Sequence, residues 1–164
     1  MLKIGDMEKT TGSSLKLLAQ FIKNGEDFLA QARAIPAGAL GKTPIADEWS
    51  GAYVIHHMCD GDLHFLIRYL NNLAEDSPPI FPFNEEIYPE RINYSKRDPA
   101  ASLAGIAGNF LVAKDILTTI PSADWKRSST HLERGIITLF DMVKIASDHS
   151  EAHAKQLQKI VSAL

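Results

Sequence analysis

Cysteine is nearly missing from this chain of 164 residues, because Cys59 is the only one. A single cysteine excludes a disulfide within the chain and suits a reducing compartment. The sequence also has no run of about 18 consecutive apolar residues of the kind that a membrane span needs. Residues 1–10 carry no apolar core typical of a secretory signal. These absences predict a cytoplasmic protein with no membrane partner.

An excess of positive charge is missing too. The 17 basic and 20 acidic side chains give a formal net charge of −3, without the basic stripe that nucleic-acid binders turn toward phosphates. We therefore expect no nucleic-acid partner. The length fits one domain with a sizeable core, so residues 1–164 are predicted to form a single domain.

Four stretches show helical spacing of apolar residues, and each is bounded by residues that start or stop helices. The predicted helices cover residues 13–35, residues 47–77 with Asp47 as N-cap, residues 98–120 opened by Asp98 and Pro99, and residues 138–164 with a capping box formed by Thr138 and Asp141. No strand is expected. A proline- and aromatic-rich loop, residues 77–97, is expected to be ordered and to roof a site. The sequence therefore predicts an all-α four-helix bundle with a long loop between its second and third helices.

Two histidines interrupt the apolar stripe of the last predicted helix. His149 and His153 are four residues apart, so they lie on one helix face about 6 Å apart along its axis. A buried polar group without a partner costs about 1–3 kcal/mol, so two imidazoles on a core-facing stripe need something to bind. The alternatives are a hydrogen-bonded pair of core histidines and a metal site, and a metal site needs a third ligand.

The second predicted helix supplies candidates for that ligand in His56, His57 and His64. One of them, together with the pair on the last helix, gives three nitrogen ligands with coordination positions left open for water or substrate, as in catalytic metal sites. Asp60 follows His57 by one turn and is a candidate for orienting a ligand or accepting a proton. Cys59 projects toward the apolar side and is expected to be a buried structural thiol.

Several short motifs resemble, in their order and spacing, the DinB-like bundles and, within them, the YfiT-like group of metal-dependent hydrolases. The matching segments are Glu48-Trp49-Ser50, residues 56–60, Ile67-Arg68, residues 75–85, Trp125, His131, residues 135–139, His149, His153 and Gln156. The resemblance places the metal ligands at His57, His149 and His153. It departs at Phe83-Asn84, where relatives tend to have tyrosine and aspartate, and at Gly51 and Gly61 within the second helix.

The resemblance implies a four-helix bundle with a nickel or zinc ion, commonly a homodimer, among relatives that use low-molecular-weight thiols such as bacillithiol or mycothiol. Two enzymatic hypotheses follow for a small-molecule substrate. In a hydrolase the ion activates water, with Asp60 or His64 as proton acceptor; in a thiol S-transferase it activates the sulfur of a small thiol cofactor. The alternative is a non-catalytic, stress-related bundle in which the metal is structural or a small ligand is bound. A di-iron site is disfavoured, because no histidine has a glutamate three positions before it.

Overall fold

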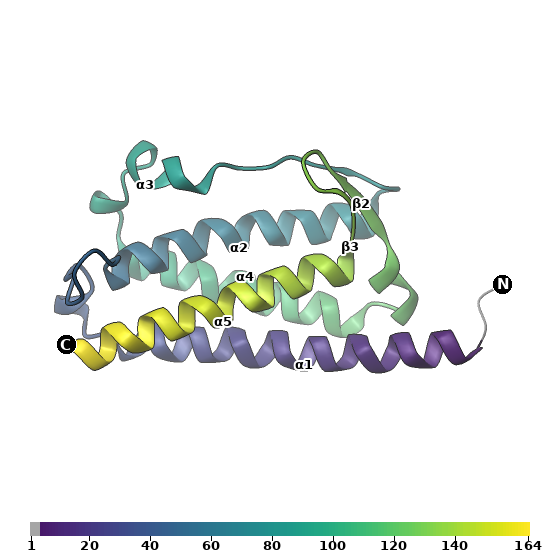
Figure 1. Cartoon of the computed structure of the whole chain (residues 1–164), viewed down its shortest axis with the longest axis horizontal. Coiled ribbons are helices and arrows are strands. Elements are labelled where there is room, and N and C mark those ends of the chain that lie inside the picture. The colour runs from purple at the N-terminus through teal and green to yellow at the C-terminus, as the bar shows by residue number, and fades with distance from the viewer. Residues whose placement is uncertain (1–3) are drawn as a thin grey trace.

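Four long helices make up the protein, as the computed structural model in Figure 1 shows. The helices are α1 (Ile4–Ala34), α2 (Gly51–Ala74), α4 (Pro99–Thr119) and α5 (Leu139–Ala163). The structure describes the backbone of residues 4–164 and the side chains of residues 12–164. Residues 1–3 belong to the N-terminal segment without an expected targeting signal and lie outside the described part. The predicted four-helix bundle is confirmed.

The helices form a ring in which α1 packs against α5 and α4, and α2 packs against α4 and α5. Neighbours α2 and α4 run parallel, whereas α2 and α5 run antiparallel (Figure 1). The connection from the end of α2 must return along the whole length of α2, about 36 Å, before the parallel helix α4 can begin beside it. The long connection between α2 and α4 is therefore a consequence of the topology.

The helix ends follow local capping chemistry. Asp98 caps α4, with Pro99 at the first helical position, and Thr138 and Asp141 form the capping box of α5, both as predicted. Asp47 is not the N-cap of α2, because its φ of 61° is left-handed; Ser50 is, and its Oγ accepts a hydrogen bond from the Tyr53 backbone N–H at 3.2 Å. Helix α1 begins at Ile4, earlier than predicted.

Short elements fill the connections. They are the 3-10 helices η1 (Ala37–Ala39), η2 (Glu85–Ile87), η3 (Tyr94–Lys96) and η4 (Ser122–Lys126), the short helix α3 (Tyr88–Arg91), and the strands β1 (Pro79–Ile80), β2 (Ser128–His131) and β3 (Gly135–Thr138). Strand β1 pairs parallel to β2, and β2 pairs antiparallel to β3. The sequence did not predict this sheet, because its strands are too short to show alternation and Ile136 in β3 is 78% exposed.

The core lies between the four helices, where Val54, Ile55, Leu139, Val143 and Leu157 have no exposed surface. Cys59 is buried against it, as expected.

Helix α4 is apolar on most of its circumference. Among the described helices it is the one whose length and composition would also suit a membrane span, with a mean hydropathy of 1.3 over 18 residues. Its Ile106, Phe110 and Leu117 are buried in the bundle core, while Leu111 and Val112 stay exposed. Helix α4 packs along α1 and α2, so in this structure it is one of the helices of the bundle.

Candidate metal centre

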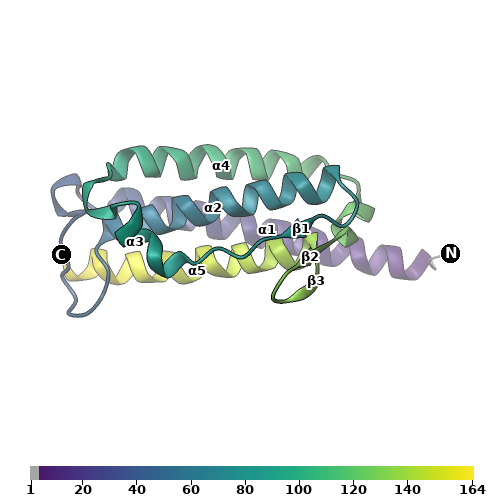
Figure 2. The same cartoon turned by 90° about the horizontal axis from the view of Figure 1, so that it is seen from above.

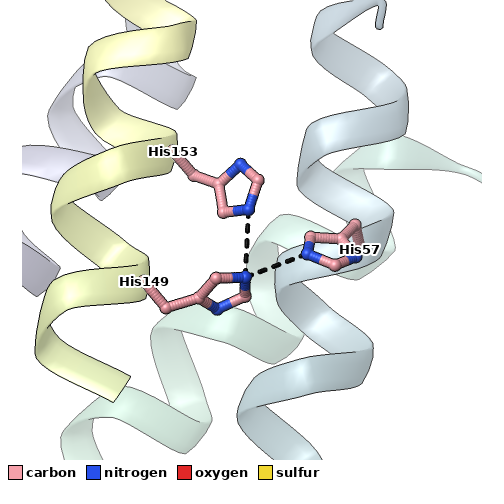
Figure 3. Close-up of side chains that lie close together, drawn as sticks. All are labelled: His57, His149 and His153. Carbon is pink, nitrogen blue, oxygen red and sulfur yellow. Dashed lines mark hydrogen bonds between the residues drawn. The ribbon is translucent and has the colours of Figure 1, made fainter. Parts of the chain in front are cut away.

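Antiparallel packing of α2 and α5 brings three histidines to the same level of the bundle. His57 comes from the second turn of α2, and His149 and His153 come from successive turns of α5 (Figure 3). The Nε2 atom of His149 lies 3.0 Å from Nε2 of His57 and 3.0 Å from Nε2 of His153. The ligand atoms of all three lie within 4.8 Å of one another. The structure therefore brings together the residues that the sequence predicts as metal ligands; we refer to them as the histidine trio.

Burial keeps the trio uncharged. Desolvation, reinforced by the neighbouring imidazoles, lowers the pKa of His149 to about 3 and that of His57 to about 4. Burial also lowers the pKa of His153. At neutral pH each ring is unprotonated and keeps a nitrogen lone pair, which is the form that binds metal ions.

Gln156 fixes the orientation of one ring. The Nδ1–H of His153 donates to Oε1 of Gln156 at 2.8 Å, and Nε2 of Gln156 donates to Glu48 Oε2 at 3.2 Å. With its proton on Nδ1, His153 presents a lone pair on Nε2 toward the other two rings. Support of a ligand's second nitrogen is typical of metal-bound histidines.

The spacing of the trio fits a shared ion better than hydrogen bonds alone. A ring nitrogen has one in-plane site, either a proton or a lone pair, so Nε2 of His149 cannot form full hydrogen bonds with both of its neighbours. Two nitrogens that each lie 2.0–2.1 Å from one ion, at an angle between the octahedral and tetrahedral values, are about 3 Å apart, as are both pairs that include His149. An all-imidazole donor set suits zinc, nickel and similar divalent ions, and three ligands leave positions open.

The other predicted site residues lie around the trio. Asp60 is buried and accepts hydrogen bonds from Tyr94 Oη and from Arg97 Nη1, both at 2.7 Å, so these contacts lead toward η3. His64 Nε2 lies 3.0 Å from Tyr88 Oη, and its ring stacks on Phe83 at 3.8 Å. The catalytic roles of Asp60 and His64 stay predictions.

His56 lies outside the trio, as the resemblance indicated. Its side chain is fully buried, and its Nδ1 lies 2.8 Å from Ser102 Oγ.

A cavity of about 340 Å³ opens beside His149, between α2, α5 and the long loop. Residues 80–86 pass over the groove between α2 and α5, so the loop covers the site as expected (Figure 2). Glu85, from this loop, places its Oε2 3.9 Å from Nε2 of His57. Sequence reasoning missed Glu85 as a site residue, because no periodicity tells where a loop side chain points.

The trio predicts one tightly held divalent ion per chain. Protein purified without an affinity tag should contain about one equivalent of a transition metal by elemental analysis, and His153→Ala should lose it because two nitrogens hold an ion poorly. The matched control is His64→Gln, which removes an imidazole of α2 outside the trio and should keep the ion. Full occupancy in His153→Ala would refute the ligand assignment.

Gln156 should contribute to metal affinity without binding the ion. Gln156→Leu removes the acceptor for the Nδ1–H of His153 and should weaken metal affinity by about 10- to 100-fold, measured by competition with a chelator. Gln158→Leu changes an exposed glutamine of the same helix and should leave the affinity unchanged. Equal affinities in the two variants would contradict this role.

Removal of the ion should leave an acid-sensitive protein. The pKa of a histidine in the unfolded chain is near 6.5, whereas the pKa values of His149 and His57 in the folded protein are about 3 and about 4. Between about pH 4 and pH 6.5 the unfolded state therefore binds more protons than the folded state. The stability that the neutral rings provide is complete above about pH 6.5 and is lost as the pH falls toward 4. The free energy of unfolding of the metal-free protein, measured with urea, should show this loss as the pH falls, and the His149→Gln variant should show a smaller loss. Identical pH profiles for the two proteins would exclude His149 as a cause of the acid sensitivity.

Comparison with known protein sequences identifies the family. The family model described as the DinB superfamily matches residues 20–157. The chain is 28% identical over 134 residues to the "Putative metal-dependent hydrolase YfiT" of Bacillus subtilis, covering 80% of this chain and 75% of that protein. It is 25% identical to "Putative metal-dependent hydrolase OB0782" of Oceanobacillus iheyensis, covering 68% of this chain and 64% of the relative.

Solved structures show the same fold. YfiT from Bacillus subtilis, described as "a probable metal-dependent hydrolase with an unusual four-helix bundle topology", superposes with a TM-score of 0.74 at 23% identity, over 89% of this chain and 86% of that one. The mycothiol-dependent maleylpyruvate isomerase superposes with a TM-score of 0.70 at 14% identity, over 88% of this chain and 60% of the isomerase. Since the family model covers more than half of the chain, this protein belongs to the DinB superfamily.

Proposed function

We propose that this protein is a metal-dependent enzyme that activates a nucleophile for attack on a small-molecule substrate, with hydrolysis as its first candidate reaction. The observation that carries the proposal is that His149 of the histidine trio lines a cavity of about 340 Å³, together with Glu85. A purely structural site would be expected to have four protein ligands. The names of the curated relatives, which are called metal-dependent hydrolases, support the same reaction class.

Glu85 supplies the group that hydrolysis needs beside the ion. The trio would hold the divalent ion, and the ion would supply a lowered pKa for a bound nucleophile. The carboxylate of Glu85, at 3.9 Å from His57 Nε2, is placed to accept the proton that the nucleophile loses. The aromatic ring of Trp49 lies 5.2 Å from the ring of His57 and parallel to that of His153, and so limits the approach of water from that side.

Transfer of a low-molecular-weight thiol is the second candidate, and the size of the cavity favours it. A volume of about 340 Å³ is far larger than a water nucleophile requires and is within the range of small-molecule sites. The fold shared with a mycothiol-dependent isomerase supports this candidate. In this reaction Glu85 accepts the proton of the thiol, and the sulfur adds to an electrophile in the same cavity.

Other expectations remain predictions of the sequence. They are nickel or zinc as the ion, a homodimer, a cytoplasmic location and the absence of nucleic-acid and membrane partners. The non-catalytic bundle is the hypothesis against which the enzyme assays are judged.

Activity assays on metal-loaded protein distinguish these functions. An ester panel without thiol tests hydrolysis, and a small thiol with a chlorinated aromatic acceptor tests transfer. Glu85→Gln should lower the rate constant kcat of the active reaction by about 100-fold while metal content stays at one equivalent. Glu90→Gln, an exposed change on α3, is the control. Inactivity in both assays with the metal bound would favour the non-catalytic bundle.

A further inference from the structure

The cavity beside the trio has two chemically different ends. The end at α5 is lined by His149 and Glu85, and the end toward the β2–β3 hairpin is lined by Arg68, His131 and Arg134. Gly61 on α2 faces His149, and Arg68 lies seven residues further along the same helix, so the two ends are about 10 Å apart along its axis. We call the three residues Arg68, His131 and Arg134 the cationic end.

Arg68 is held in place without a counterion. Its guanidinium lies over the rings of Phe65 and Phe83 at 5.5 and 5.4 Å, and its Nη2 donates to the Phe81 carbonyl at 3.2 Å. No described carboxylate pairs with it or with Arg134 within 4.0 Å, including Glu86 and Glu133, which also line the cavity and are exposed. A guanidinium positioned by aromatic rings keeps most of its five N–H donors free for a ligand.

His131 adds a hydrogen-bond donor to the cavity wall. The Nδ1 atom accepts the backbone N–H groups of Glu133 and Arg134 at 3.2 and 3.3 Å, so the ring proton must be on Nε2. The residue is only 7% exposed, yet Nε2 is not among the fully buried atoms without a partner, and no described residue accepts a hydrogen bond from the Nε2–H. Burial and the charges of Arg68 and Arg134 lower the pKa of His131, and the carboxylate of Glu133 opposes part of this shift.

We propose that the cationic end binds a carboxylate on the substrate, about 10 Å from the reacting group at the trio. The planar fork of Arg68 matches a carboxylate, Arg134 adds charge, and the Nε2–H of His131 donates the remaining hydrogen bond. The substrate is thus an elongated organic acid whose reactive bond lies at the histidine trio and whose acid group lies beneath the hairpin. This inference rests on the proposed function, because it uses the trio as the reacting end.

The test measures binding instead of turnover. Alkyl hydroxamates chelate the ion with one end, so the metal-loaded protein is titrated by calorimetry with hexanohydroxamate, which has a neutral tail, and with the monohydroxamates of glutarate, adipate and suberate, which end in a carboxylate. The best carboxylate tail should bind at least about tenfold more tightly than the neutral one, with an optimum chain length, and added salt should reduce the gain.

Variants identify the groups responsible. Arg68→Gln should remove most of the gain from the carboxylate tail and leave hexanohydroxamate binding unchanged. Arg134→Gln alters an exposed side chain that forms no hydrogen bond or ion pair with the described residues, so it should reduce the gain without affecting folding. Arg33→Gln, at the exposed end of α1, is the charge-matched control and should have no effect.

The outcomes separate the two proposals. If hexanohydroxamate binds and the carboxylate tail adds nothing, or if Arg68→Gln and Arg134→Gln keep the full gain, the carboxylate site is refuted while the metal centre stands. If no hydroxamate binds to protein that contains its ion, the open coordination required by the proposed function is refuted instead.

Discussion

The antiparallel pairing of α2 and α5 is the constraint on which the site depends. His57 lies near the start of one helix, and His149 and His153 lie on either side of the middle of the other; the antiparallel packing of the two helices brings them level. Rotation matters as well, since residues three or four apart share a helix face. The fully buried Val54, Ile55, Leu139 and Val143 fix that rotation by facing the core. Packing of the bundle thereby presents three neutral imidazoles to one point.

The topology that creates the trio also creates its cover. Because α2 and α4 are parallel neighbours, the connection between them must return along the full length of α2. Its course takes residues 80–86 across the open groove between α2 and α5 (Figure 2). Pairing of β1 with β2 anchors the connection near one end, and the contact of Tyr88 with His64 anchors it further along. A covered cavity beside the trio is therefore a consequence of how the helices are connected.

The sequence predicted the parts of the fold and site that depend on periodicity and capping. Helix spacing located the bundle, and the caps at Asp98 and Thr138 were confirmed because side-chain capping is a local interaction. The i, i+4 pair His149 and His153 was visible for the same reason. Asp47 was misread as a cap, since the sequence did not reveal its left-handed backbone. Glu85 and the cationic end depend on long-range contacts of the loop and hairpin, which no local pattern encodes.

The two ends of the cavity are built from different kinds of structure, and they therefore differ in how well they tolerate substitution. Two packed helices hold the trio, so a change there disturbs the core and the ion together. The opposite end combines one helical side chain, Arg68, with His131 and Arg134 of the hairpin segment, and Arg134 is exposed. Exposed loop positions tolerate substitution far better than buried helical ones. Under the proposed function, substrate choice can therefore change at the hairpin end while the chemistry at the trio is retained, and relatives with the same fold are expected to differ most in the residues that face this end of the cavity.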